Sequence, residues 1–275
     1  MSLRRKILIV AGIVLGLAIL IPVIRHYQLR FAVASYVAEL KAKGEPMELA
    51  QVIPPPVPPE QNGAPIFLKA ASLLDTNWNV LGSNSPPAML MVAPGKAMIE
   101  SAQPDIRTRD GTNSWEEVEA ALAEDSDSLK LLSQINDHPT LDFNLDYKDG
   151  LDKIKILHLA PLKRSAQKLS AEAMDDLHRG DTASAGKDIS TMLSLVNGAS
   201  NDRVVISELV RIAIAAIAVP VAWEMLQSTN VTDEQLAALQ HDWMNLEFIR
   251  GDENALAMER VMDEITITKW RNSNS

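Results

Sequence analysis

The sequence predicts an all-α protein in which an N-terminal transmembrane helix continues into a stem and then into a repeat-like domain of antiparallel helical hairpins. Only 4% of its 275 residues are aromatic, whereas helix-forming alanine, leucine, isoleucine and methionine are plentiful. An uncharged apolar run stands near the N-terminus, and apolar residues recur at helical spacing in several later segments. We expect a cytoplasmic tail and anchor (1–24), a helical stem with a proline-rich joint (25–60), and an all-helical domain (61–275).

The anchor is predicted from residues 7–24, which are all uncharged and follow three basic residues at 4–6. A helix of this length covers about 27 Å, close to the thickness of the hydrocarbon core of a bilayer. A cleaved signal peptide is the alternative, but the possible cleavage site at 32–34 lies beyond two further arginines. We therefore expect an uncleaved, single-pass signal anchor, with the N-terminus in the cytoplasm and the body on the extracytoplasmic, periplasmic side.

Two glycines in the anchor, Gly12 and Gly16, form a G-x-x-x-G pattern. This spacing lets two transmembrane helices approach closely, so self-association through this face is possible.

The stem is predicted as a helix over residues 25–43 that stops at Gly44. The stretch "VIPPPVPPEQNGAPIF" (52–67) follows and contains two P-x-x-P frames of the kind that groove-binding domains recognise. Because no Arg or Lys lies between Lys43 and Lys69, we interpret the prolines as a stiff spacer of roughly 19 Å.

The first half of the body is predicted to hold three helices, over residues 61–77, 95–102 and 114–135. The last of these opens with Ser114-Trp115-Glu116-Glu117, a capping box. Gly, Pro and Asn are frequent over residues 79–113, which we expect to be the least regular part of the body.

The second half of the body shows long helical patterns joined by short links, which favour antiparallel neighbours. The expected helices span residues 150–179, 182–198, 203–228, 233–249 and 252–268. Gly180-Asp181 fits a C-cap followed by an N-cap, and Thr232 opens a second capping box. The segment 204–226 is apolar almost all round, but Glu208 and Arg211 indicate a core helix rather than a second membrane span.

No catalytic, cofactor-binding or metal-binding motif emerges from the sequence. The chain has no cysteine, and its two S-x-x-K matches (165–168 and 184–187) lack the partner motifs of penicillin-recognising enzymes. Five histidines occur without metal-ligand spacing: His26, His138, His158, His178 and His241. We expect no cofactor and no metal. Residues 44–275 carry 19 basic and 35 acidic residues, a net charge of −16, so nucleic acid is not an expected partner.

Six segments occur in a fixed order: "ELKAKGEP", "PEQNGAPIF", "LHRGDTASAGKDISTMLSL", "ISELVRIAIAAI", "TDEQLAALQ" and "ALAMERV". Through these six segments, the chain resembles, over roughly residues 36–265, an uncharacterised family of bacterial proteins. Members of that family have one N-terminal membrane anchor and an all-helical extracytoplasmic body. The resemblance implies architecture and location, and no activity. Chains of that family usually continue further, whereas this one ends at Ser275.

Among the charged positions within the matching segments, Glu208, Arg211, Glu259 and Arg260 are the first candidates for a site. They form a candidate cluster, either functional or structural, and the structural alternative is ion pairing between core helices.

These features predict a membrane-tethered helical scaffold or interaction protein of the bacterial cell envelope, which binds another envelope protein or component between its hairpins. One alternative is an envelope hydrolase with carboxylates that converge in a pocket, with each other or with His158 or His178. Another is a binder of an apolar ligand or lipid. Because no catalytic motif is present, the sequence favours a protein that is not an enzyme.

Overall fold

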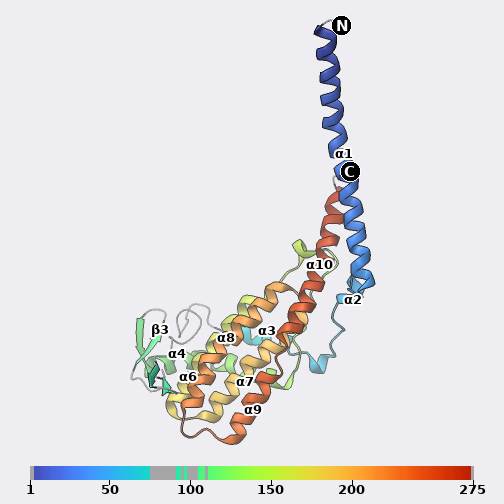
Figure 1. Cartoon of the computed structure of the whole chain (residues 1–275). Helices are drawn as coiled ribbons and strands as arrows, with labels where there is room; N and C mark the ends of the chain where they lie inside the picture. Colours follow the sequence, from blue (N-terminus) through green and yellow to red (C-terminus); the bar gives the residue numbers. More distant parts are fainter. Residues whose placement is uncertain (1–2, 75–90, 94–95, 98–104, 109–110, 274–275) are drawn as a thin grey trace. The chain divides into compact units, whose positions relative to one another are not determined.

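The computed structural model describes residues 3–74, 91–93, 96–97, 105–108 and 111–273. Helices dominate this part of the chain, which confirms the all-α prediction (Figure 1). Contacts group the chain into two units, one ending at Glu48 and one beginning at Leu49. The finer division into anchor, stem and joint stays a prediction.

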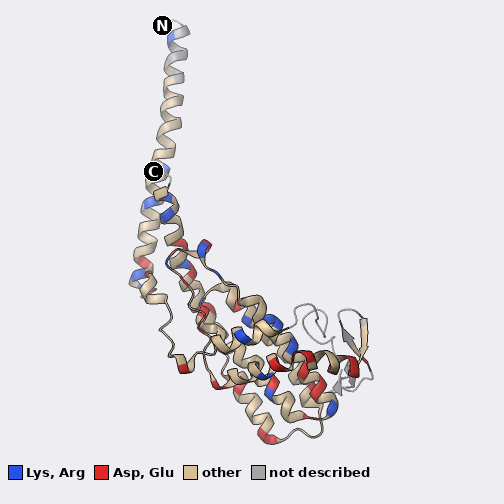
Figure 2. Ribbon diagram, turned by 180° about the vertical axis from the view of Figure 1, so that it is seen from behind, with Lys and Arg blue, Asp and Glu red and all other residues tan. Residues whose placement is uncertain are grey.

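The first unit contains one continuous helix, α1 (Leu3–Ala42), which merges the predicted anchor and stem. It is long and apolar enough to cross a membrane, and Figure 2 shows a long stretch of it without charged residues. Pro22 lies inside the helix without ending it. The helix ends as predicted at Gly44, which has φ 81°, and the amide of Glu45 donates to the carbonyl of Leu40.

The second unit begins with α2 (Leu49–Val52), a 3₁₀ turn (Pro59–Gln61) and α3 (Ala64–Leu73). Helix α3 starts three residues later than predicted because the side chain of Asn62 binds backbone groups outside the helix and at its start. Its side-chain oxygen accepts hydrogen bonds from the amides of Ala64 and Asp142, each at 2.9 Å, and its amide nitrogen donates to the carbonyl of Asp142. The predicted continuation over 75–77 lies outside the described residues.

Two short antiparallel hairpins follow, and neither was predicted. The first pairs β1 (Met91–Ala93) with β2 (Lys96–Ala97), and the second pairs β3 (Asp105–Thr108) with β4 (Gly111–Ser114). The helix predicted over 95–102 is wrong at β2, and its residues from 98 onward lie outside the described residues. Strands this short carry too few residues for an alternating pattern to be recognised, although Ile106 of β3 is fully buried in the core.

The helix predicted over 114–135 is divided into α4 (Trp115–Glu124), α5 (Ser126–Leu132) and a 3₁₀ turn (Ser133–Asp137). The capping box between Ser114 and Glu117 is confirmed. The break occurs at Asp125, whose buried carboxylate accepts a hydrogen bond from Lys168 at 2.6 Å. A buried ammonium group needs an acceptor of this kind. The contact with Lys168 therefore explains why the helix is interrupted at Asp125.

Apart from one 3₁₀ turn (Leu151–Lys153), residues 150–158 before α6 (Leu159–Arg179) are not helical, so the helix predicted from residue 150 begins nine residues too early. Gly150 adopts φ 89°, which is incompatible with a right-handed helix, and Pro161 fits only within the first turn of the helix that follows.

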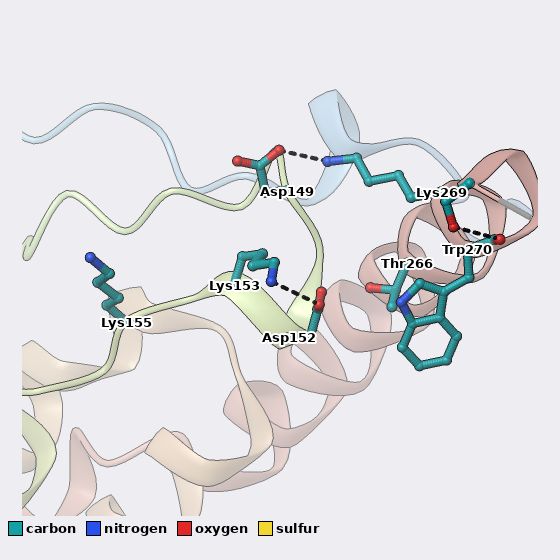
Figure 3. A pocket seen from close by; sticks show the side chains of 8 residues that line it. Asp149, Asp152, Lys153, Lys155, Thr266, Lys269 and Trp270 are labelled. Carbon is teal, nitrogen blue, oxygen red and sulfur yellow. Dashed lines mark hydrogen bonds and ion pairs between the residues drawn. The ribbon is translucent and has the colours of Figure 1, made fainter.

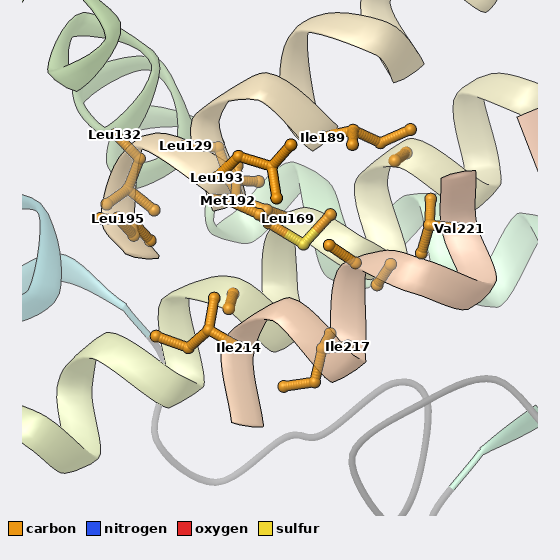
Figure 4. Close-up of a cluster of buried hydrophobic side chains, with 14 of the residues drawn as sticks. Leu129, Leu132, Leu169, Ile189, Met192, Leu193, Leu195, Ile214, Ile217 and Val221 are labelled. Carbon is orange, nitrogen blue, oxygen red and sulfur yellow. The ribbon is translucent and has the colours of Figure 1, made fainter. Parts of the chain in front are cut away.

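Three long helices form the centre of the body: α6, α7 (Thr182–Gly198) and, after a 3₁₀ turn (Ala199–Asp202), α8 (Val205–Gln227). Each packs on the other two, and the short links make neighbours antiparallel. The predicted caps are confirmed, since Gly180 has φ 80° and Asp181 accepts from the amide of Ser184. Leu169, Ile189, Met192, Ile214, Ile217 and Val221 interdigitate in the core (Figure 4).

The chain ends in α9 (Asp233–Met244) and α10 (Phe248–Ser273). The capping box of Thr232 with Gln235 is confirmed. The predicted boundary near residue 250 is wrong, because Gly251 lies inside α10 rather than between two helices. Helix α10 packs on α8 and α2 and completes a second, smaller core: Val52, Tyr147, Val204, Met258, Val261 and Met262.

Candidate functional site

Glu208 and Arg211 form a buried ion pair on α8, each about 1% exposed. They lie one helical turn apart, and the Arg211 guanidinium donates to the Glu208 carboxylate. Arg211 Nε also donates to the carbonyl of Val196 on α7 at 2.6 Å, and its guanidinium carbon lies 5.3 Å from the ring centroid of Phe248 on α10. One side chain therefore links three helices.

The backbone of α10 passes directly over this pair at Gly251. A Cβ on Gly251 would lie 2.5 Å from Glu208 Oε2 and 2.5 Å from Arg211 Nη1, so any side chain there would have to displace the ion pair. Burial raises the pKa of Glu208, and the positive charge of Arg211 opposes that rise. Within the described chain, Glu208 Oε1 is buried without a hydrogen-bond partner.

The other two predicted residues, Glu259 and Arg260, are neighbours on α10 and are partly buried. Glu259 Oε1 accepts a hydrogen bond from the amide of Val205 at 2.9 Å, which satisfies a backbone donor at the first residue of α8. The structure thus joins Glu208 to Arg211 directly and brings Glu259 to the start of the same helix. That these four residues have a functional role stays a prediction.

Sequence reasoning missed a buried polar network around Asp202. The carboxylate oxygen Asp202 Oδ2 lies 2.7 Å from His158 Nε2 and accepts from Ser207 Oγ at 2.8 Å. Tyr147 donates its hydroxyl to the Asp202 backbone carbonyl at 2.7 Å, and the ring of His158 stacks on Phe143 with centroids 3.8 Å apart.

This network contains the residue types of a hydrolase triad in a different order. In a Ser-His-Asp triad, histidine stands between serine and aspartate and takes the serine proton. Here the aspartate stands between Ser207 and His158, and all three side chains are buried. The arrangement ties the segment before α6 to the start of α8 and supplies no activated nucleophile. The other histidine proposed for a hydrolase, His178, stacks on Trp115 with centroids 4.2 Å apart.

Three carboxylates gather between α6 and α7. Burial, followed by the negative charges of Glu172 and Asp176, raises the pKa of Asp188 to about 9. Burial, followed by the charge of Asp176, raises the pKa of Glu172 to about 7. Asp188 therefore holds a proton at neutral pH. Over the described ranges, no group of three His, Cys, Asp or Glu side chains could hold a metal ion.

A surface pocket of about 610 Å³ lies between α10 and the segment 149–155 (Figure 3). Two acids line it, and each faces a lysine: Lys269 Nζ lies 2.6 Å from Asp149 and Lys153 Nζ lies 3.6 Å from Asp152. The hydrogen bond from Lys269 lowers the pKa of Asp149. A hydrolase with paired carboxylates needs one acid that stays protonated, and this pocket favours the ionised form of Asp149.

A second surface pocket, of about 510 Å³, has the proline run as one wall. Pro54, Pro55 and Pro56 face residues 144–148 across it. This part of the P-x-x-P stretch thus lies beside the body, while its role as a stiff joint stays a prediction.

Among the described residues of the body, a continuous exposed apolar surface runs along α8. We define the outer face of α8 as Ile206, Leu209, Ile212, Ala216, Val219, Trp223 and Leu226. These residues follow one another at three- and four-residue spacing, so they form one stripe over the full helix. The exposed fractions of the six large side chains range from 38% to 55%. Surfaces of this kind are uncommon on soluble monomers and mark interaction sites.

The buried side of the same helix explains its high hydropathy. Helix α8 is long and apolar enough to cross a membrane, yet half of its apolar window is buried inside the body. Sequence reasoning identified it as a core helix and did not notice that its opposite side stays uncovered. The exposed positions were visible in the sequence as apolar residues on the side away from Glu208 and Arg211.

In comparisons with known proteins, no family model, no curated sequence and no solved structure matches the chain.

Proposed function

We propose that this protein is a membrane-tethered interaction protein of the bacterial cell envelope, which binds an apolar helix of a protein partner on the outer face of α8. The observation that carries the proposal is the exposed stripe itself: seven uncharged residues in line on a body whose residues from 44 onward carry a net charge of −16. Exposed apolar surface costs free energy in water, and a docked helix removes that cost.

A protein helix fits this surface better than a bilayer does. The stripe lies along a single helix, and near its middle the small Ala216 stands between larger side chains, an order of sizes that suits helix-on-helix packing. The acidic body would also be repelled from the anionic headgroups of a membrane surface.

Tethering follows from α1, whose residues 7–24 would cross the membrane. The basic residues before the span support an orientation with the N-terminus in the cytoplasm and the body on the periplasmic side. In that arrangement the outer face of α8 would meet envelope proteins.

The alternative functions have less support in the geometry. The acids of the pocket at Asp149 are paired with lysines, and His158 is buried in a network without an activated serine. Both surface pockets are lined by charged or polar groups in addition to Trp270 or the prolines, which does not suit a lipid chain.

The experiment places a photo-crosslinking amino acid at Val219 in the full chain in native membranes, with the same group at Ala238, an exposed position on α9, as control. We expect a discrete protein adduct from Val219 and none from Ala238. A second substitution, Leu209→Lys, should remove the adduct while the helical circular dichroism stays unchanged. Adducts with lipid alone, or a protein adduct that survives Leu209→Lys, would contradict the proposal.

A further inference from the structure

We propose that the helix bound on the outer face of α8 is the α8 of a second copy of this chain, packed antiparallel about a two-fold axis at Ala216. This inference rests on the proposed function and names its partner. It is carried by three observations on α8: a symmetric order of side chains, the absence of charge on the outer face, and the exposed area.

The order of side chains along the stripe is symmetric about Ala216. In an antiparallel pair with its axis at one residue, positions equally far before and after that residue lie opposite each other across the two copies. Leu209 and Trp223 are both seven residues from Ala216, and Ile206 and Leu226 are both ten residues away. Four of the six large side chains of one copy therefore meet a large apolar side chain of the other, while Ile212 lies opposite Pro220 and Val219 opposite Ala213.

The centre of the stripe has the small residues that a close crossing needs. Ala216 lies on the axis, and the partly buried Ala213 lies one turn before it. Small side chains at the crossing point let two helix backbones approach, so the larger residues on both sides can interdigitate. Ile212 of one copy would then pack near Val219 and Pro220 of the second copy.

Charge does not oppose this contact at the interface itself. The ionisable residues of α8 are Glu208, Arg211 and Glu224, and all three are buried on the inner side of the helix. Two acidic bodies can therefore meet along α8 without placing like charges in contact. The remaining repulsion acts over longer distances and is screened by salt.

The exposed area is close to what a specific dimer needs. At roughly half exposure, side chains of this size present on the order of 600 Å² per copy, compared with about 800 Å² per partner in a standard interface. Anchoring both copies in one membrane raises their effective concentration and lowers the area required. Gly12 and Gly16 of α1, which have the G-x-x-x-G spacing, could add a second contact between the copies.

Single cysteines test the geometry directly, because the natural chain contains none. In the full chain in membranes under mild oxidation, Ala216→Cys should give a disulfide-linked homodimer, since this position faces itself across the axis. Leu209→Cys and Trp223→Cys should crosslink poorly alone and several-fold better when the two variants are mixed. Ala238→Cys on α9 is the matched exposed control and should stay monomeric.

The outcomes separate this inference from the proposed function. One outcome is that Ala216→Cys is linked only to a different protein and that mixing the other two variants does not increase crosslinking. In that case the partner is not a second copy of this chain, and the proposed function stands. If Ala238→Cys dimerises as readily as Ala216→Cys, the crosslink reports only crowding in the membrane, and the inference is overturned. If the outer face yields neither a homodimer nor a partner adduct, both proposals fail.

Discussion

Gly251 of α10 lies against Arg211 of α8 so closely that a Cβ on Gly251 would lie 2.5 Å from Arg211 Nη1. The close approach covers a buried ion pair, and a side chain at residue 251 would force that pair to move. Several properties of the body depend on this contact and on the buried polar groups around it.

Gly251→Ala should destabilise the body by about 1 to 3 kcal/mol, because the new methyl group has to displace a buried guanidinium or carboxylate. Urea unfolding followed by circular dichroism measures the change. Glu253→Ala, two residues further along α10 and exposed, is the control and should have little effect. Equal stabilities for Gly251→Ala and the wild-type chain would show that α10 does not press on the pair.

Arg211→Met should cost about 3 to 5 kcal/mol, because it leaves the Glu208 carboxylate buried without its cation. The double variant Glu208→Leu with Arg211→Met should recover most of that loss, since two apolar side chains of similar size replace a desolvated pair. The same urea titration gives both numbers. A double variant as unstable as Arg211→Met would mean that Arg211 acts mainly through Val196 and Phe248.

Stability of the body should fall as the pH rises, and Asp188 should cause a measurable part of that fall. Its folded pKa, about 9, is raised above its ordinary value of 3.8, so its stabilising contribution is complete below about pH 4 and is lost as the pH rises through 9. Glu172, with a folded pKa of about 7, acts in the same direction. Asp188→Asn mimics the protonated acid and should flatten the dependence.

The measurement for this pH effect is a set of thermal melts between pH 5 and pH 9. Asp188→Asn should exceed the melting temperature of the wild-type chain by an amount that grows from pH 5 to pH 9. The exposed variant Glu253→Gln serves as the control and should follow the wild-type curve. A parallel pH dependence of the Asp188→Asn and wild-type chains would rule out a protonated Asp188.

Asn62→Ala should loosen the connection between the proline run and the body. The side chain makes three hydrogen bonds to the backbone of residues 64 and 142, so its loss should cost roughly 1 to 3 kcal/mol. Limited proteolysis over residues 52–61 should become faster. Gln61→Ala, at the exposed neighbouring position, should leave the cleavage rate unchanged.

The helix starts that could be predicted best are those with a capping signal in the local sequence. Helix α7 matches its predicted range because Gly180 and Asp181 mark its start, and α4 begins at its capping box. The predicted helix boundaries are wrong where a contact with a distant part of the chain sets the end of the helix. Asp125 interrupts a helix to pair with Lys168, which lies 43 residues later in the chain.

The candidate site shows the same limit. Glu208 and Arg211 were found because they share one helix and lie one turn apart. The bond between His158 and Asp202 spans 44 residues and no motif marks it, so only the fold brings these residues together. The raised pKa of Asp188 depends in the same way on the packing of α6 against α7.

The continuity of α1 has a mechanical consequence. Forty residues at about 1.5 Å each give a rod of roughly 60 Å, and about half of that length is enough to cross a bilayer. Helical hydrogen bonds make such a rod stiff to twisting, so a rotation of the anchor about its own axis is carried to Ala42. Gly44, with φ 81°, ends this rod, so a substitution there would change where the stiff segment stops.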